Sequence, residues 1–244
     1  MTEIDRAAFA DALGKIFAKN NIATPSAAQA EAFYRLTAHL LSENERYNLT
    51  AITDLPGILL RHYADSVCCT KYIPEGVTLL DVGCGAGFPT LPLAIMRPDL
   101  RITAMDATKK RVDFVAGCVS LLDLSNVCAV CGRAEDLARG ELREAFDCVT
   151  ARAVAELRIL AELCIPFVRI GGVFLSMKAK NANEELAAAQ AGIGTLGARL
   201  SAREDFYLTG NGEALERAAL SFTKVRPTPP TYPRPYARMK KKPL

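Results

Sequence analysis

Apolar side chains recur at helical spacing throughout residues 1–73, with few β-branched runs among them. Their positions are Phe9, Leu13, Ile16, Phe17, Ala32, Phe33, Leu36, Leu40 and Leu41. Thr24-Pro25-Ser26 contains residues that are common at the start of a helix, and Asp54-Leu55-Pro56-Gly57 interrupts the pattern. The spacing therefore predicts a helical N-terminal layer that ends in a helix over residues 58–72.

From Val77 onward, short apolar runs alternate with helical segments. Strands are predicted over residues 77–82, 101–105, 127–131, 146–150 and 173–177, with weaker ones at 205–208 and 219–225. The helices between them are predicted over residues 91–96, 109–122, 134–138, 154–168 and 181–196. Continuous apolar runs are typical of buried parallel strands. Repeated strand–helix units predict an α/β fold, with an open, mostly parallel sheet and helices on both faces.

The pattern divides the chain into three parts: a helical layer (1–73), a sheet-bearing domain (74–226) and a C-terminal tail (227–244). The tail holds six of the 13 prolines, so we expect it to be extended rather than packed. From Lys224 to the end there are seven basic residues and no acidic one, whereas positions 1–223 carry 23 basic and 27 acidic residues. This asymmetry indicates a polyanionic partner, although a tail that only aids solubility would have the same composition.

Several classes of protein fit the sequence poorly. It has no uncharged apolar run of about 18 residues and no basic-then-apolar leader, so neither a membrane span nor a secretion signal is expected. Most of the eight cysteines lie in apolar segments, which predicts buried, reduced thiols in a cytoplasmic protein. Cys128 and Cys131 form a CxxC pair, but on a strand they would point to opposite faces. With His39 and His62 as the only histidines, no metal site is expected.

The segment from Asp81 to Pro89, DVGCGAGFP, follows the first predicted strand and carries the most specific chemistry. Glycines there allow a sharp turn and close approach of a ligand at the carboxyl end of the strand. A dinucleotide fingerprint would need a third glycine where Phe88 stands, which disfavours a nicotinamide oxidoreductase. Asp81 suits the cationic S-adenosylmethionine better than a pyrophosphate. Asp106, at the end of the second strand, is placed to accept hydrogen bonds from both ribose hydroxyls. These features favour a Rossmann-like class I methyltransferase.

Further motifs extend the picture beyond the glycine turn. They are Tyr47-Asn48-Leu49-Thr50-Ala51-Ile52, Arg61-His62-x-x-Asp65-Ser66, Lys110-Arg111-Val112, Ala134-Glu135, Ala151-Arg152-Ala153, Tyr232-Pro233-Arg234 and the terminal Lys241-Lys242-Pro243-Leu244. Together they resemble the bacterial 16S ribosomal RNA guanine-N7 methyltransferases, historically called glucose-inhibited division protein B. The resemblance covers roughly residues 40–180 and the tail.

The resemblance implies a site that binds S-adenosyl-L-methionine. Gly83, Gly85, Gly87 and Phe88 would form the cofactor turn, Ala134 and Glu135 would lie along the adenine, and Arg152 would complete the pocket. Substrate contacts would come from Lys178, Arg234 and Arg238, although Lys178-Ala179 departs from the Lys-Gly that many members have. The implied partner is 16S ribosomal RNA or the small ribosomal subunit, and the protein is expected to act as a monomer.

No acid–base pair is evident, and methyl transfer to guanine N7 needs none, because N7 already has an in-plane lone pair. For His62 we expect packing, or a hydrogen bond between the helical layer and the sheet, rather than a role as base. Asn48 and Thr50 are expected to bond loop backbone near the cofactor. Two alternatives stay open here: a methyltransferase that acts on another RNA, a protein or a small molecule, and a non-enzymatic RNA-binding protein on the same fold.

Overall fold

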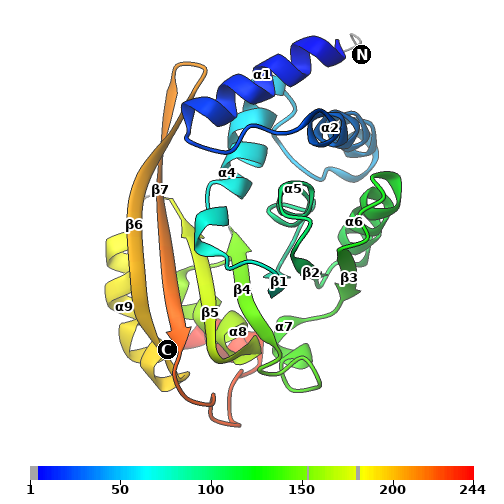
Figure 1. Cartoon of the computed structure of the whole chain (residues 1–244). Coiled ribbons are helices and arrows are strands. Elements are labelled where there is room, and N and C mark those ends of the chain that lie inside the picture. Colours follow the sequence, from blue (N-terminus) through cyan, green and yellow to red (C-terminus); the bar gives the residue numbers. More distant parts are fainter. Residues whose placement is uncertain (1–4, 153, 180–181) are drawn as a thin grey trace.

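The computed structural model describes residues 5–152, 154–179 and 182–244. Within these ranges seven strands form one sheet in the order β3-β2-β1-β4-β5-β7-β6 (Figure 1). Strands β1 to β5 are parallel, whereas β7 is antiparallel to both β5 and β6. The predicted α/β class with a mostly parallel sheet is therefore confirmed.

The elements follow one another along the chain with short connections. The strands are β1 (Thr78–Val82), β2 (Arg101–Asp106), β3 (Val127–Cys131), β4 (Phe146–Arg152), β5 (Val168–Lys178), β6 (Ala198–Gly210) and β7 (Glu213–Lys224). The helices are α1 (Arg6–Lys19), α2 (Ala27–Tyr47), α3 (Leu55–Gly57), α4 (Asp65–Val67), α5 (Thr90–Met96), α6 (Lys109–Leu121), α7 (Ala134–Leu137), α8 (Leu157–Cys164), α9 (Ala182–Thr195) and α10 (Tyr236–Lys241). A π-helical segment (Ile58–Ala64) precedes α4, and 3₁₀ turns cover Thr70–Tyr72 and Ile165–Phe167.

Both faces of the sheet are covered, because successive side chains of a strand point to opposite faces. Leu79 of β1 packs in one apolar cluster with Leu93 of α5. Its neighbour Leu80 packs in another cluster with Leu157 and Leu160 of α8. A strand that is apolar on both sides must be buried on both sides, which is why the predicted continuous runs became the central strands.

The helical layer lies over the α5–α6 side of the sheet (Figure 1). Asp5 caps α1, and Ser26 with Gln29 forms a capping box at the start of α2, so the helix start predicted around Thr24-Pro25-Ser26 is confirmed. The helix predicted over 58–72 is confirmed only in part, because the helical turns begin earlier, at Leu55, and end at Val67, before a separate 3₁₀ turn. The predicted interruption at residues 54–57 is therefore wrong, and Asp54 caps the start of α3. The Ser66 hydroxyl donates to the His62 carbonyl there, a bond that competes with regular helix geometry.

Two other predicted boundaries were also wrong. The helix expected over 154–168 is the shorter α8, and Pro166 lies in the 3₁₀ turn that follows it. Strand β5 therefore begins at Val168 rather than Val173, with an irregular register against β4. The predicted helix start at Asn181 and the last residue of the Ala151-Arg152-Ala153 motif lie outside the described residues.

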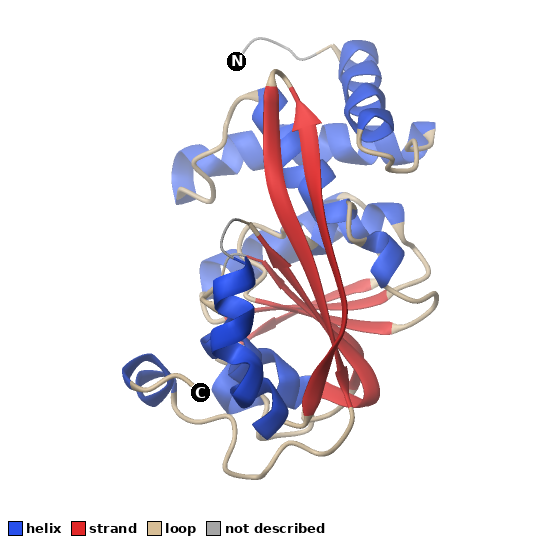
Figure 2. Cartoon of the chain, turned by 90° about the vertical axis from the view of Figure 1, so that its left-hand side faces the viewer, coloured by secondary structure: helices blue, strands red, loops and turns tan. Residues whose placement is uncertain are grey.

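The last two strands form a hairpin that is much longer than predicted. β6 has 13 residues and β7 has 12, so the hairpin reaches past the sheet to the helical layer (Figure 2). At its tip, Asn20 donates to the Thr209 carbonyl at 2.9 Å and accepts from the Thr209 amide at 2.7 Å. Outside the predicted segments 205–208 and 219–225, the two strands are mostly exposed or half-buried and carry several charged side chains, so they lack the apolar signal from which strands are predicted.

The expectation that the C-terminal tail is extended and unpacked was wrong. Met239 of α10 is fully buried, and Arg234 forms an ion pair with the fully buried Glu162 of α8. The terminal Leu244 packs beside Gly192 of α9, where no larger side chain would fit. Proline density predicted the irregular backbone but not the apolar and ionic contacts that hold it.

The prediction of buried thiols was wrong for the CxxC pair. Cys128 and Cys131 are exposed, whereas Cys69, Cys84, Cys118, Cys148 and Cys164 are buried and Cys68 is half-buried. Strand β3 is an edge strand, which leaves its side chains open to solvent. Among the described residues there is no group of acidic, cysteine and histidine side chains that could hold a metal ion, and no helix long and apolar enough to cross a membrane.

Candidate cofactor and substrate site

A cavity of about 650 Å³ opens at the carboxyl ends of the parallel strands. Gly83 follows β1, Asp106 ends β2, Glu135 follows β3 and Arg152 ends β4, and all four line the cavity. The crossovers that leave β1 and β4 diverge at this edge, which is where open α/β sheets bind their ligands.

The glycine turn forms one wall of the cavity. The amides of Gly83 and Cys84 both donate to the Met105 carbonyl, at 2.8 and 2.9 Å, which ties the turn to β2. Gly83 has a φ of +75° and Gly85 a φ of +57°, values that disfavour other residues. A Cβ atom at Gly83 would also come within 2.6 Å of the Val154 side chain. The backbone conformation at position 83 and the nearby Val154 side chain therefore both disfavour any residue other than glycine.

Asp81 lies beneath this turn rather than among the residues that line the cavity. Its side chain is fully buried, and the Thr90 hydroxyl donates to its Oδ2 at 2.6 Å. Burial raises the pKa of Asp81 to about 6, although the Thr90 hydrogen bond opposes that shift. Gly87 is likewise off the cavity, packed against Leu91. Direct contact of either residue with the cofactor stays a prediction.

Asp106 is the best-placed acid in the cavity. The Gly85 amide donates to its Oδ2 at 3.1 Å and the Thr108 amide donates to its Oδ1 at 2.8 Å. These bonds fix the carboxylate, and each oxygen keeps lone-pair capacity for a further donor such as a ribose hydroxyl. Arg111 lies 3.5 Å away on the same side of the cavity.

Phe88 and Arg152 lie close together in the cavity wall. The Phe88 ring stacks on His62, with centroids 4.2 Å apart and planes 6° from parallel. The Arg152 guanidinium lies 5.7 Å from the centre of the same ring. Each of the three residues lines the cavity, so an aromatic stack and a cation form part of its wall.

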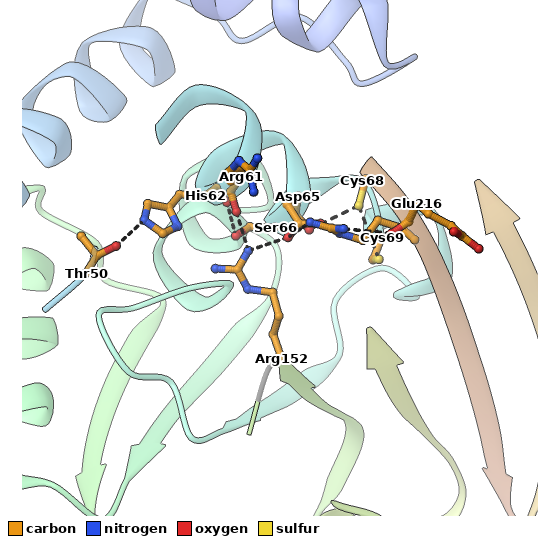
Figure 3. Close-up of polar contacts among 10 residues, drawn as sticks. Thr50, Arg61, His62, Asp65, Ser66, Cys68, Cys69, Arg152 and Glu216 are labelled. Atoms are coloured by element: carbon orange, nitrogen blue, oxygen red, sulfur yellow. Dashed lines mark hydrogen bonds and ion pairs between the residues drawn. The ribbon is translucent and has the colours of Figure 1, made fainter. Parts of the chain in front are cut away.

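Asp65 holds Arg152 in place, and no role had been predicted for it. Arg152 donates to Asp65 Oδ2 and to the Arg61 carbonyl, both at 3.0 Å (Figure 3). Arg217, from the long hairpin, reaches the other oxygen of Asp65 with its Nε at 2.6 Å. All four residues line the cavity, so one carboxylate joins the helical layer, β4 and the hairpin at the site.

His62 is held as a neutral side chain in this wall. Figure 3 shows its contact with Thr50, whose hydroxyl lies 2.9 Å from His62 Nε2 and accepts a hydrogen bond from the Ile52 amide. Burial, reinforced by the positive charge of Arg152, lowers the pKa of His62 to about 4. A group with that pKa is neutral at pH 7, and its stacking and its bond to the loop match the packing role expected for it.

The lowered pKa of His62 predicts a dependence of stability on pH. Below about pH 6.5 an unfolded imidazole takes up a proton, whereas the folded one does so only near pH 4. The stabilisation from this group is therefore complete above pH 6.5 and decreases as the pH falls toward 4. We expect it to be about 1–2 kcal/mol smaller at pH 5 than at pH 7.

Urea unfolding of the wild type and of His62→Gln at both pH values measures this contribution. Asp81 has a raised pKa and acts in the opposite direction over part of this range, so the difference between the two proteins isolates His62. Equal pH dependence in His62→Gln and the wild type would contradict the prediction.

The three predicted substrate residues do not line the cavity. Lys178 pairs with Glu185 at 2.8 Å and donates to the Ala155 carbonyl at 2.9 Å, and Arg234 is engaged by Glu162. Arg238 is exposed on α10. Substrate binding by these residues therefore stays a prediction.

Sequence reasoning missed several residues that line the cavity. Arg61, Arg111 and Arg133 bring partly exposed guanidinium groups, with 41, 48 and 63 % of their side chains accessible. The motifs that contain Arg61, Asp65 and Arg111 were recognised, but their spacing alone did not show that they meet. Arg217 lies in a polar stretch with no sequence signal, and Tyr236 lies in the tail that was expected to be unpacked.

Comparison with known proteins agrees with this geometry. Residues 29–206 match the family described as rRNA small subunit methyltransferase G. A protein of that name from Staphylococcus carnosus is 43% identical over 220 residues, covering 88% of this chain and 90% of its own length. The protein of that name from Deinococcus radiodurans is 44% identical over 207 residues, covering 84% and 81%. The chain belongs to the rRNA small subunit methyltransferase G family.

Solved structures are similar to the chain in fold only. NSun6 from Pyrococcus horikoshii, solved with SFG, gives a TM-score of 0.55 at 15% identity and covers 66% of this chain and 52% of its own. The YcgJ protein from Bacillus gives a TM-score of 0.52 at 15% identity and covers 68% and 100%. The predicted class I methyltransferase fold and the predicted family are confirmed. The protein is an S-adenosylmethionine-dependent rRNA methyltransferase.

The described residues fit S-adenosylmethionine. The cavity has a volume suited to a nucleoside-sized ligand, and left-handed glycines expose backbone on one side of it. Asp106 offers acceptors for ribose hydroxyls, and Glu135 is a further acid on the wall. Ala134 lines the cavity as well, and its place along the adenine stays a prediction.

Proposed function

We propose that this protein methylates N7 of a guanine in 16S ribosomal RNA, within the small ribosomal subunit, and that it acts in the cytoplasm as a single chain. One observation supports the proposal above the others. In a chain of this family, the cavity that fits S-adenosylmethionine is rimmed by partly exposed arginines, Arg61, Arg111 and Arg133. Such groups suit phosphate contacts close to the acceptor base.

The residues of the cavity are suited to positioning rather than to proton transfer. S-adenosylmethionine supplies, when bound, a methyl group on a positively charged sulfur, and guanine N7 already has a free lone pair. His62 has no need to act as a base, and its lowered pKa would make it a weak one. Asp106 and the glycine turn orient S-adenosylmethionine, while the arginine rim holds the RNA. Alignment of this kind is enough to lower a barrier by several kcal/mol.

Transfer of labelled methyl groups tests the proposal. The full-length protein is incubated with methyl-labelled S-adenosylmethionine and with naked 16S RNA, purified small subunits lacking the modification, or total protein. N7-methylguanine is then located by chemical strand scission. Label in N7 of a 16S guanine is the expected result. Label in protein or in another RNA position, or binding without transfer, would contradict it.

Exposed basic residues on α10 and just after it predict a second site of RNA binding. Arg238, Lys240, Lys241 and Lys242 are exposed, on a segment whose first residue lines the cavity. Changing all four to Gln should weaken RNA binding several-fold near 0.1 M salt. It should also reduce the log–log salt slope by roughly 0.7–0.9 for each phosphate that these residues neutralise in the wild type.

The measurement is binding of 16S RNA or small subunits at several salt concentrations. Lys15→Gln and Lys19→Gln in α1 provide a control, because they remove charge from a helix that does not line the cavity. An unchanged slope in the four-residue variant would show that these residues do not bind phosphates.

A further inference from the structure

The C-terminal segment enters the wall of the cofactor cavity. Tyr236, the first residue of α10, is half-buried and lines the cavity. It packs in the same apolar cluster as Ala134 and Leu163, which line the cavity too. Tyr236 therefore lies on the α7–α8 side of the cavity. Ala134 and Glu135, which were predicted to lie along the adenine, are on the same side.

Three charged side chains of the domain hold this segment in place. Arg143 donates to the carbonyls of Tyr232, Thr228 and Pro229, at 2.9, 2.8 and 3.3 Å. Arg139 donates to the Pro233 carbonyl at 2.5 Å. Glu162 accepts from both the backbone amide and the guanidinium of Arg234, at 2.7 and 2.6 Å.

These bonds differ from the contacts of a loosely attached tail. Glu162 is fully buried, so its charge depends on Arg234 for compensation. Met239 is fully buried one turn after Tyr236, which fixes the near side of α10 against the domain. The path from Thr228 to Met239 is thus anchored on both sides of Tyr236, and the ring has little freedom to leave the wall.

We infer that Tyr236 is a cofactor-binding residue, whose ring packs against the adenine of S-adenosylmethionine, so that docking of the C-terminal segment and cofactor binding stabilise each other. This inference rests on the proposed function for the identity of the ligand. An aromatic face suits a purine because both are flat and apolar over most of their area. Tyr236 is half-buried in the apolar cluster that contains Leu163, which suits a contact within the cavity better than one with RNA outside it.

Calorimetric titration of the full-length protein with S-adenosylmethionine, in the absence of RNA, tests the inference. Tyr236→Ala should weaken binding by about tenfold, whereas Tyr236→Phe should bind within about twofold of the wild type. Tyr207→Ala provides the control, because Tyr207 is a 65% exposed hairpin residue that does not line the cavity. An unchanged affinity in Tyr236→Ala, or an equal loss in Tyr207→Ala, would overturn the inference. Failure of the wild type to bind S-adenosylmethionine would instead count against the proposed function.

Reciprocity gives a second test, and its deciding comparison uses the wild type alone. If the segment and the cofactor stabilise each other, S-adenosylmethionine must slow the opening of the segment in the wild type. Trypsin cleavage between Arg238 and Met239 reports that opening, because Met239 is buried when the segment is docked. We expect saturating S-adenosylmethionine to slow this cleavage about tenfold, and S-adenosylmethionine should protect Tyr236→Ala much less. Equal cleavage rates with and without S-adenosylmethionine in the wild type would overturn the inference.

Discussion

Replacing Asp106 with alanine should weaken the binding of S-adenosylmethionine by roughly 100-fold, which corresponds to two hydrogen bonds to a charged group. The carboxylate also accepts hydrogen bonds from the amides of Gly85 and Thr108, at 3.1 and 2.8 Å. The alanine variant therefore loses the ribose acceptors and the anchor of the glycine turn together. Asp106→Asn keeps one acceptor oxygen and should lose about tenfold.

Titration calorimetry gives these affinities, and thermal unfolding of each variant separates lost binding from lost structure. Asp113→Ala is the matched control, because Asp113 is an exposed acid on α6 that pairs with Lys109 and does not line the cavity. It should bind S-adenosylmethionine like the wild type. Wild-type affinity in a folded Asp106→Ala protein would remove the residue from the cofactor site.

The central sheet was predictable because its signals are local. The apolar runs that became β1, β2 and β4 are buried on both faces, so no polar alternation obscures them. The glycines at 83 and 85 report a left-handed turn by their identity alone. Asp106 followed from the spacing between two strand ends. The cavity therefore contains most of the residues that sequence reasoning selected at strand ends.

Contacts between segments that are far apart in the chain were much harder to predict from the sequence. Arg217 lies in the polar outer half of β7 and reaches Asp65, 152 residues earlier in the chain, only because the hairpin extends beyond the sheet. Pairing across such a separation leaves no periodicity in either segment. Glu162 did carry a signal, since it is the single acid between Leu157 and Phe167 in an apolar stretch. A buried acid of that kind demands a cationic partner, and the tail supplies Arg234.

Removing the carboxylate of Asp65 should have the largest effect on stability. Asp65, Arg152 and Arg217 have side chains only 11, 15 and 18% exposed, so Asp65→Ala leaves two mostly buried guanidinium groups without their shared partner. Losing one member of a buried ion pair costs about 3–5 kcal/mol, chiefly because the remaining charge is uncompensated. Urea unfolding should show a loss of that size in the free energy of unfolding. Asp205→Ala is the control, since its ion pair with Arg203 is more exposed and should be worth less than about 1 kcal/mol.

A double-mutant cycle then tests whether Asp65 joins the hairpin to the cavity wall. If Asp65 compensates the charge of Arg217, the two losses should not add. The double variant Asp65→Ala/Arg217→Ala should then lose about 1–3 kcal/mol less free energy of unfolding than the two single variants lose together. The bond from Arg152 to the Arg61 carbonyl, at 3.0 Å, can remain in every variant, so the coupling reports the hairpin contact itself. Additive losses would mean that Arg217 and Asp65 contribute independently. The hairpin would then be held to the helical layer by its other contacts, which include the Asn20–Thr209 bonds and the Arg61–Glu213 ion pair.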